Sequence, residues 1–255
     1  MEHFLLLWTL RKASKDDIPF DNQCMNKKTL TCYRCSSAAT TKEHFPPPRC
    51  FFPKGSGLNL QLKTVPSCTT HNNDKSGDDQ FLLAHICLNA SKGPGLPREI
   101  FNRSISPQLE RSFNFRASIA EDAKHFTDGT AHYKVDLDRF DNFFDHLCWA
   151  LYFERYELPF DDTTHSINHV YFSLHTEDSQ ELGVRTMLAS TIDSFRKEYN
   201  DRISSYEAAK VTESVYSNQV IDPIGAGGSI TIIHTFYGIF EVVSMLSKKW
   251  KHLDS

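Results

Sequence analysis

A chain of 255 residues can form one large domain or two small ones, each with its own hydrophobic core. Its composition, with 40% hydrophobic and 24% charged residues, is ordinary for a soluble globular protein, and no apolar run is long enough to span a bilayer. The formal net charge of −4 gives no sign of a nucleic-acid partner. Residues 27–80, however, hold eight Lys or Arg and only four Asp or Glu, so this acidic protein contains a basic segment suited to phosphate.

Residues 1–30 are expected to form an N-terminal segment. Its apolar run, Phe4 to Leu10, is short, is preceded by Glu2 instead of a basic region and lacks a small-residue cleavage site, so it does not fit a signal peptide. The seven cysteines show no spacing typical of a disulfide framework. We therefore expect a cytoplasmic protein with no membrane partner.

Residues 31–90 contain two pairs of metal-binding side chains. Cys32 and Cys35 are separated by two residues, and Cys68 and His71 repeat this spacing. Together they supply four ligands for a tetrahedral structural Zn²⁺ site, which would stabilise a segment too short to fold by burial alone. Cys50 lies between the two pairs and is a rival ligand, but it has no partner at the same spacing.

Three further side chains in this segment indicate hydrolytic chemistry. Glu43 and His44 stand side by side before a run of prolines, and Asn72 directly follows the last predicted zinc ligand. The oxygens of Glu43 and Asn72 are hard ligands that suit Mg²⁺ or Mn²⁺. His44 can accept a proton from water near neutral pH. A structural metal, a catalytic metal and a base together are typical of a metal-dependent phosphodiester hydrolase.

These motifs resemble the HNH endonucleases of the ββα-metal, or His-Me finger, superfamily, in a zinc-knuckle variant found in bacteria. The resemblance covers about 55 residues and is carried by Cys32, Cys35, Ala39-Thr40, Glu43-His44, Pro46-Pro47, Thr64 to Cys68, His71 and Asn72. It implies that His44 is the general base and that Glu43 and Asn72 hold the catalytic cation. Gln61 aligns best with the middle position of the family's motif, with Asn59 as the alternative. The chain departs from the family at this position and in having His71 as the last zinc ligand.

The resemblance further implies a DNA substrate and a role in restriction, phage defence or mobile elements. Basic residues around the motif are candidates for binding the phosphate backbone without reading sequence: Lys42, Arg49, Lys54, Lys63 and Lys75. Two alternatives remain open at this point. One is an RNA-directed toxin, and the other is a non-catalytic zinc module that binds nucleic acid or a protein partner.

The rest of the chain predicts further helices and strands. Residues 78–89 begin with acidic residues and then become apolar, which predicts a helix. Residues 91–129 are expected to be a linker or bracing segment. Residues 130–255 are expected to form a C-terminal domain with strands near 133–137 and 170–174, a helix near 187–199, and a hairpin over 230–246 that turns at Phe236-Tyr-Gly238. Apolar residues at helical spacing from Phe140 to Tyr152 predict an amphipathic helix.

The predicted fold class is therefore α+β, with a zinc-stabilised ββα-metal module followed by an α+β C-terminal domain whose sheet is the smaller one. Gly225 to Gly228 lacks the lysine of a phosphate-binding loop and is interpreted as a turn. We expect the C-terminal domain to select the substrate and to contact a second copy of the chain or a partner subunit.

Overall fold

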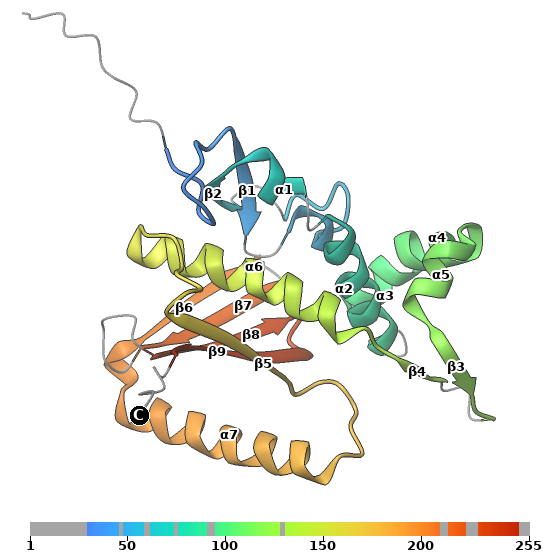
Figure 1. Ribbon diagram of the computed structural model, residues 1–255. Coiled ribbons are helices and arrows are strands. Elements are labelled where there is room, and N and C mark those ends of the chain that lie inside the picture. Colours follow the sequence, from blue (N-terminus) through green and yellow to red (C-terminus); the bar gives the residue numbers. More distant parts are fainter. Residues whose placement is uncertain are drawn as a thin grey trace, which may run out of the picture.

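A computed structural model describes residues 30–45, 48–58, 62–73, 76–90, 95–127, 131–209, 214–222 and 229–249. These residues form an α+β fold with two antiparallel two-stranded sheets and one antiparallel five-stranded sheet (Figure 1), which confirms the predicted class. The apolar run Phe4 to Leu10 and the glycines at 225–228 lie outside the described residues. None of the helices in the described part of the chain combines the length and the apolar character needed to cross a bilayer.

The N-terminal part is a hairpin followed by two helices. Its elements are β1 (Thr41–Phe45), the 3-10 turn η1 (Arg49–Phe51), β2 (Lys63–Ser67), α1 (Thr69–Asn73) and α2 (Ser76–Asn89). β1 pairs with β2 so that Glu43 faces Val65 and His44 faces Thr64 across the ladder. Because side chains alternate along a strand, Glu43 is buried and its neighbour His44 is exposed. The predicted helix at 78–89 is confirmed by α2, whose first turn holds Asp78 and Asp79.

A helical lobe and a small hairpin follow, and they project at one end of the molecule (Figure 1). Their elements are α3 (Leu96–Ile100), the π turn η2 (Phe101–Ile105), α4 (Ser106–Arg111), α5 (Phe113–Ile119), β3 (Glu121–His125) and β4 (Ala131–Lys134). In η2 the amide of Ser106 donates to the carbonyl of Phe101, five residues earlier. Pro107 has no amide hydrogen to donate in the turn that follows, which favours a change in helical hydrogen bonding here.

The long helix α6 (Leu137–Tyr156) confirms the amphipathic stripe predicted between Phe140 and Tyr152. It begins at the N-cap Asp136, which accepts a hydrogen bond from the amide of Arg139, so the strand predicted over 133–137 ends at Lys134. The rings of Phe140, Phe143 and Phe144 are fully or almost fully buried. Figure 1 shows why the burial is so complete: α6 lies between the N-terminal elements and the five-stranded sheet.

The C-terminal sheet has the strand order β5-β9-β8-β7-β6, with all neighbours antiparallel. Its strands are β5 (His165–Tyr171), β6 (Ile203–Ala208), β7 (Tyr216–Ile221), β8 (Ser229–Phe236) and β9 (Phe240–Lys248). The predicted hairpin is confirmed, with Gly238 in its turn at a φ of +70°. The predicted smaller sheet is wrong, because five strands exceed the two of the N-terminal hairpin. Strands β6 and β7 were not predicted, because polar residues such as Ser204, Ser205 and Gln219 interrupt their apolar pattern.

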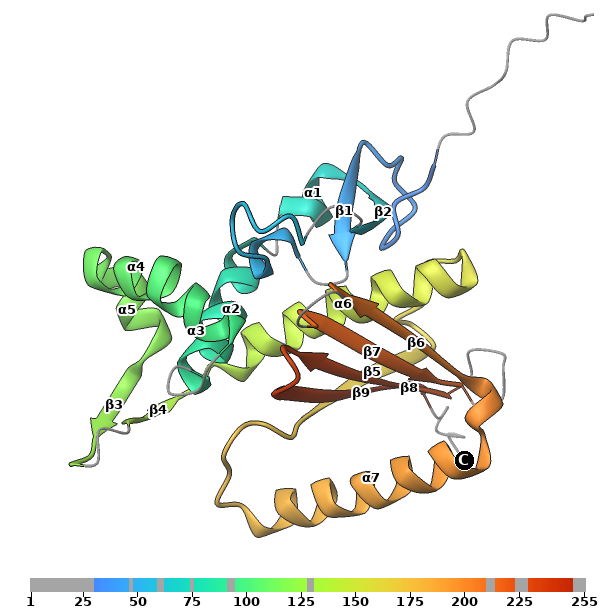
Figure 2. The same cartoon turned by 180° about the vertical axis from the view of Figure 1, so that it is seen from behind.

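Helix α7 (Ser179–Glu198) and the 3-10 turn η3 (Asn200–Arg202) connect β5 at one edge of the sheet to β6 at the other. The structure therefore confirms a helix over the predicted 187–199 region and extends it towards the N-terminus. Ile192 of α7 packs against Ile221, Ile233 and Val243 on the sheet face opposite α6. Both views show α7 on that side of the sheet (Figures 1 and 2).

The main hydrophobic core runs from the N-terminal elements through α6 to the sheet. One cluster of buried residues includes Cys32 and Phe51, the aromatic residues of α6, and Phe236 and Leu246 of the last two strands. The hydroxyl of Tyr237, in the β8–β9 turn, donates to the carbonyl of Phe51 at 2.6 Å. Residues 31–90 and 130–255 were predicted as separate domains; that division stays a prediction, and the two parts share this core.

A buried polar chain lies on the sheet face that meets α6. Nδ1 of His234 lies 2.9 Å from the hydroxyl of Tyr216, and Nε2 lies 3.0 Å from Oγ of Ser244. Oγ of Ser244 also lies 2.8 Å from Nδ1 of His169, whose Nε2 lies 3.0 Å from a carboxylate oxygen of Asp145. His234, Ser244 and Tyr216 are fully buried. These hydrogen bonds thus give partners to buried polar groups that would otherwise destabilise the core.

Candidate metal centre and adjoining pocket

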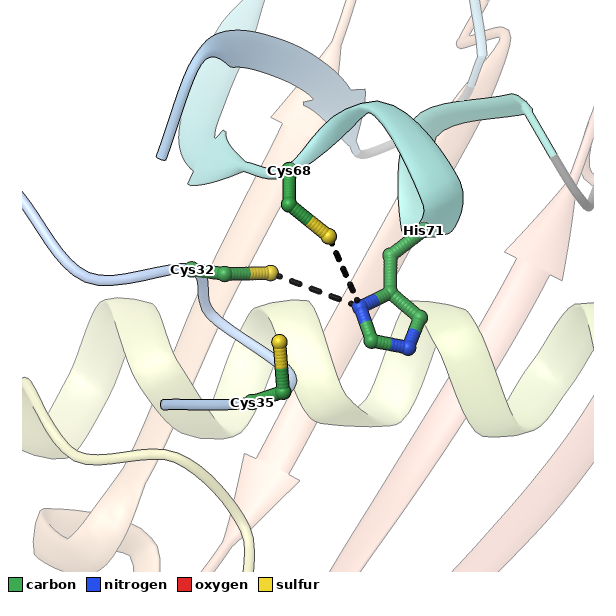
Figure 3. A group of neighbouring side chains, drawn as sticks. All are labelled: Cys32, Cys35, Cys68 and His71. Atoms are coloured by element: carbon green, nitrogen blue, oxygen red, sulfur yellow. Dashed lines mark hydrogen bonds between the residues drawn. The ribbon is translucent and has the colours of Figure 1, made fainter. Parts of the chain in front are cut away.

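The four predicted zinc ligands meet at one point (Figure 3). One ligand atom from each of Cys32, Cys35, Cys68 and His71 lies within 4.8 Å of all the others. Nδ1 of His71 is 3.5 Å from Sγ of Cys32 and 3.3 Å from Sγ of Cys68. Sulfur and nitrogen ligands of one tetrahedral zinc lie about 3.5 Å apart, given bonds of about 2.3 and 2.0 Å. The four side chains therefore fit a closed zinc site, in which His71 would bind through Nδ1.

The local backbone positions these ligands before any metal is considered. The first knuckle is the loop that carries Cys32 and Cys35, and the second carries Cys68 and His71. The amide of Cys32 donates to the carbonyl of Ser37 at 2.9 Å, which closes the first knuckle into a tight loop. The amide of Arg34 donates to Sγ of Cys32, so the sulfur keeps a polar neighbour although its residue is buried. In the second knuckle the amide of Asn72 donates to the carbonyl of Cys68 at 3.1 Å, and α1 presents His71. Cys50 is exposed and lies outside the group, so it is not the rival ligand that its position allowed.

Helix α6 anchors the first knuckle from below. The hydroxyl of Tyr33 lies 2.9 Å from Nδ1 of His146, and both side chains are buried. The guanidinium of Arg34 stacks over the ring of Trp149 at 3.6 Å from its centroid and pairs with the carboxylate of Asp162. The candidate metal centre is thus attached to the rest of the fold through Tyr33 and Arg34, the two residues that follow Cys32.

An open pocket of about 450 Å³ next to the candidate metal centre is lined by three of the four predicted catalytic residues. Glu43 and His44 of β1 and Asn72 of α1 are among its lining residues. Glu43 is 5% exposed, whereas His44 faces water. Gln61 and Asn59, the two candidates for the middle position of the motif, lie outside the described residues.

Asp79 also lines this pocket, although no motif in the sequence predicts it as a site residue. Its neighbour Asp78 points elsewhere: it accepts hydrogen bonds from Arg139 at 2.8 Å and from Asn142 at 2.6 Å, and so joins α2 to α6. Burial raises the pKa of Tyr33, and the charges of Glu43 and Asp79 raise it further, which places both carboxylates near this phenol. The only available signal was the pair of adjacent acidic residues opening α2.

The pocket offers the oxygen donors that a hard divalent cation prefers. Glu43 and Asp79 contribute carboxylates and Asn72 an amide oxygen. Within the described residues, the Cys and His group is the only set of three or more His, Cys, Asp or Glu side chains close enough to share an ion. Glu43, His44 and Asp79 do not form such a set, so a cation site in this pocket stays a prediction.

No family model, no curated protein and no solved structure matches this chain. The resemblance to HNH endonucleases thus stays a prediction that depends on the residues themselves.

The predicted phosphate-binding cations differ in their surroundings. Lys42 and Arg49 line the pocket that holds Glu43 and His44, and both are exposed. Lys54 lines a neighbouring pocket that Arg49 shares. Lys63 points towards the C-terminal part, where it pairs with the carboxylate of Glu154. Lys75 lies outside the described residues.

Proposed function

We propose that this protein is a metal-dependent endonuclease that hydrolyses phosphodiester bonds in DNA, as the resemblance to HNH endonucleases implies. The observation that carries the proposal is one pocket of about 450 Å³ whose lining includes Glu43, His44 and Asn72, the last of which directly follows His71 of the Cys and His cluster. At most 29 positions separate these three residues in sequence, and the hairpin and α1 make all three part of one pocket wall.

Each residue would have a distinct role. His44 is exposed on β1 and would accept a proton from the attacking water. Glu43, Asn72 and Asp79 would hold the divalent cation, and that cation would neutralise charge on the phosphate and stabilise the leaving oxygen. Lys42 would hold the backbone of the substrate at the rim. The zinc at the knuckles would be structural, because all four of its positions come from the protein.

The test uses the full chain purified with its zinc. Wild-type protein should nick supercoiled plasmid DNA when magnesium or manganese is added and should not cut without either. His44→Ala should slow cleavage by roughly 100-fold or more while keeping the zinc, since a positioned general base contributes about that much. His132→Ala removes an exposed histidine from β4, far from the pocket in sequence, and should cut at the wild-type rate.

A His44→Ala variant that cuts as fast as wild type would show that the base is wrongly assigned. Cleavage of RNA with duplex DNA left intact would replace DNA by RNA as the substrate. A zinc-loaded protein that binds nucleic acid but cuts neither would leave the non-catalytic zinc module. The expected role in restriction or phage defence stays a prediction.

A further inference from the structure

A second and larger pocket adjoins the candidate catalytic pocket. It has a volume of about 990 Å³ and shares Arg49, Cys50 and Gln80 with the pocket that holds His44. A volume of this size is at the upper end of the range for sites that hold whole organic ligands, about 300–1,000 Å³, and is far larger than a phosphate requires. A ligand that extends through both pockets could have its phosphate near His44 and another part in the larger pocket.

The interior of the larger pocket is apolar. Phe52, Leu83, Ile100 and Ile105 line it and are at most 5% exposed. They come from the loop after η1, from α2, from α3 and from η2, so four separate elements build this surface. Such a surface cannot solvate a phosphate or a sugar hydroxyl, but it suits the flat faces of a nucleobase.

The rim of the pocket is positively charged. Arg49, Lys54 and Arg103 line it, and Glu99 is the carboxylate among the lining residues. Arg103 and Glu99 form an ion pair at 2.7 Å. An excess of positive charge around an apolar pocket suits a polyanion, whose phosphates can pair with the cations while the face of one base packs in the pocket.

The wall formed by η2 is an unusual piece of backbone. Residues Ile100, Arg103, Ser104 and Ile105 of α3 and η2 line the pocket, and η2 is a π turn inside an otherwise α-helical run. Such π turns are rare in proteins, and many of those that are known lie at functional sites. This observation is independent of the pocket's chemistry and favours a binding role for the same wall.

We propose that the larger pocket, called the base pocket from here on, receives one unpaired nucleotide of the DNA next to the phosphate that is hydrolysed. This inference rests on the proposed nuclease function. A base inside a duplex cannot enter such a pocket unless it leaves the stack, which costs a few kcal/mol. DNA that already contains an unpaired nucleotide avoids this cost and is therefore the preferred substrate.

The test blocks the base pocket without touching the catalytic residues. Ser104 is exposed and lines the pocket, so Ser104→Trp places an indole in it. Asn102 is exposed on the same π turn and is not among the lining residues, so Asn102→Trp is the matched control. Thermal midpoint and zinc content of both variants establish that they fold. Binding is measured by fluorescence anisotropy without magnesium, with a perfect duplex, the same duplex carrying one unpaired nucleotide, and the single strand as DNA and as RNA.

Wild type and Asn102→Trp should bind the duplex with the unpaired nucleotide roughly tenfold more tightly than the perfect duplex. Ser104→Trp should lose this preference. Equal affinities for the two duplexes in wild type, or a preference that survives in Ser104→Trp, would overturn the inference. Tighter binding of the RNA strand would overturn the choice of DNA.

Magnesium is then added to separate the two proposals. Cleavage without the binding preference would refute the base pocket and leave the nuclease function. The binding preference without cleavage would refute the nuclease function and leave a pocket that binds unpaired nucleotides.

Discussion

The stability of this protein should decrease in mild acid because of a histidine buried in the sheet. His234 is fully buried on β8, and its pKa is lowered from 6.5 to about 3, mainly by burial and to a smaller extent by the charge of His169. The unfolded chain therefore takes up a proton at this residue near pH 6.5, whereas the folded protein takes it up only near pH 3. Between these values the unfolded state binds more protons, so the contribution of His234 is complete above pH 6.5 and is lost as the pH falls towards 3.

The magnitude follows from the two pKa values. A difference between 6.5 and about 3 corresponds to about 5 kcal/mol once the pH is below both. At pH 5 the unfolded state is almost fully protonated at this residue and the folded state is not, so about 2 kcal/mol has been lost relative to pH 8. This is a large share of the stability of a typical domain.

The assay compares wild type with His234→Gln by denaturant unfolding at pH 8 and pH 5. Glutamine keeps a donor and an acceptor for Tyr216 and Ser244 but does not titrate. The zinc site and all other titrating groups are common to both proteins, so their contributions cancel. Between the two pH values wild type should lose about 2 kcal/mol more than the variant. Equal losses would show that His234 is protonated in the folded protein and would refute the reasoning.

Three further predictions concern the metal centre, the core and the pocket. Cys68→Ala should reduce the zinc content from one ion per chain to almost none in elemental analysis. Cys50→Ser should keep the zinc, because Cys50 is exposed and lies outside the cluster. Equal loss of zinc in both variants would contradict the four-ligand site. Phe144→Ala should lower the free energy of unfolding by about 3–5 kcal/mol, because its fully buried ring lies against His234 and Phe236; a change below about 1 kcal/mol would contradict this packing. Asp79→Asn should raise the magnesium concentration for half-maximal cleavage roughly tenfold with zinc unchanged, and an unchanged requirement would remove Asp79 from the cation site.

Features with a local signal could be predicted from the sequence. The two knuckles depend on a spacing of two intervening residues, and that spacing alone brings Cys32 near Cys35 and Cys68 near His71. The α6 stripe follows from helical periodicity, because each apolar residue marks the same side of one helix. The β8–β9 hairpin is visible because two apolar runs flank Gly238, which takes the left-handed conformation of the turn.

Features that depend on distant contacts could not be predicted. Tyr33 meets His146 across 113 positions, and no local pattern links the two residues. Asp78 and Asp79 are adjacent acidic residues with the same helix-terminal preference, yet one joins α2 to α6 and the other lines the pocket. Consecutive helical residues point about 100° apart, so the two side chains face different neighbours. Which neighbour each one meets depends on how α2 packs in the fold, and the sequence does not show this packing. The strands β6 and β7 were missed because their polar residues resemble a loop.

The position of α6 limits how this protein could be divided or recombined. Its buried residues serve two neighbours at once, with Phe144 against the sheet and His146 against Tyr33 of the first knuckle. A fragment ending near Asn89 would leave the apolar side of α2, including Phe81, exposed to water. Any chimera that transplants the knuckles and hairpin into another scaffold must therefore supply an apolar surface equivalent to α6, which keeps these side chains out of water.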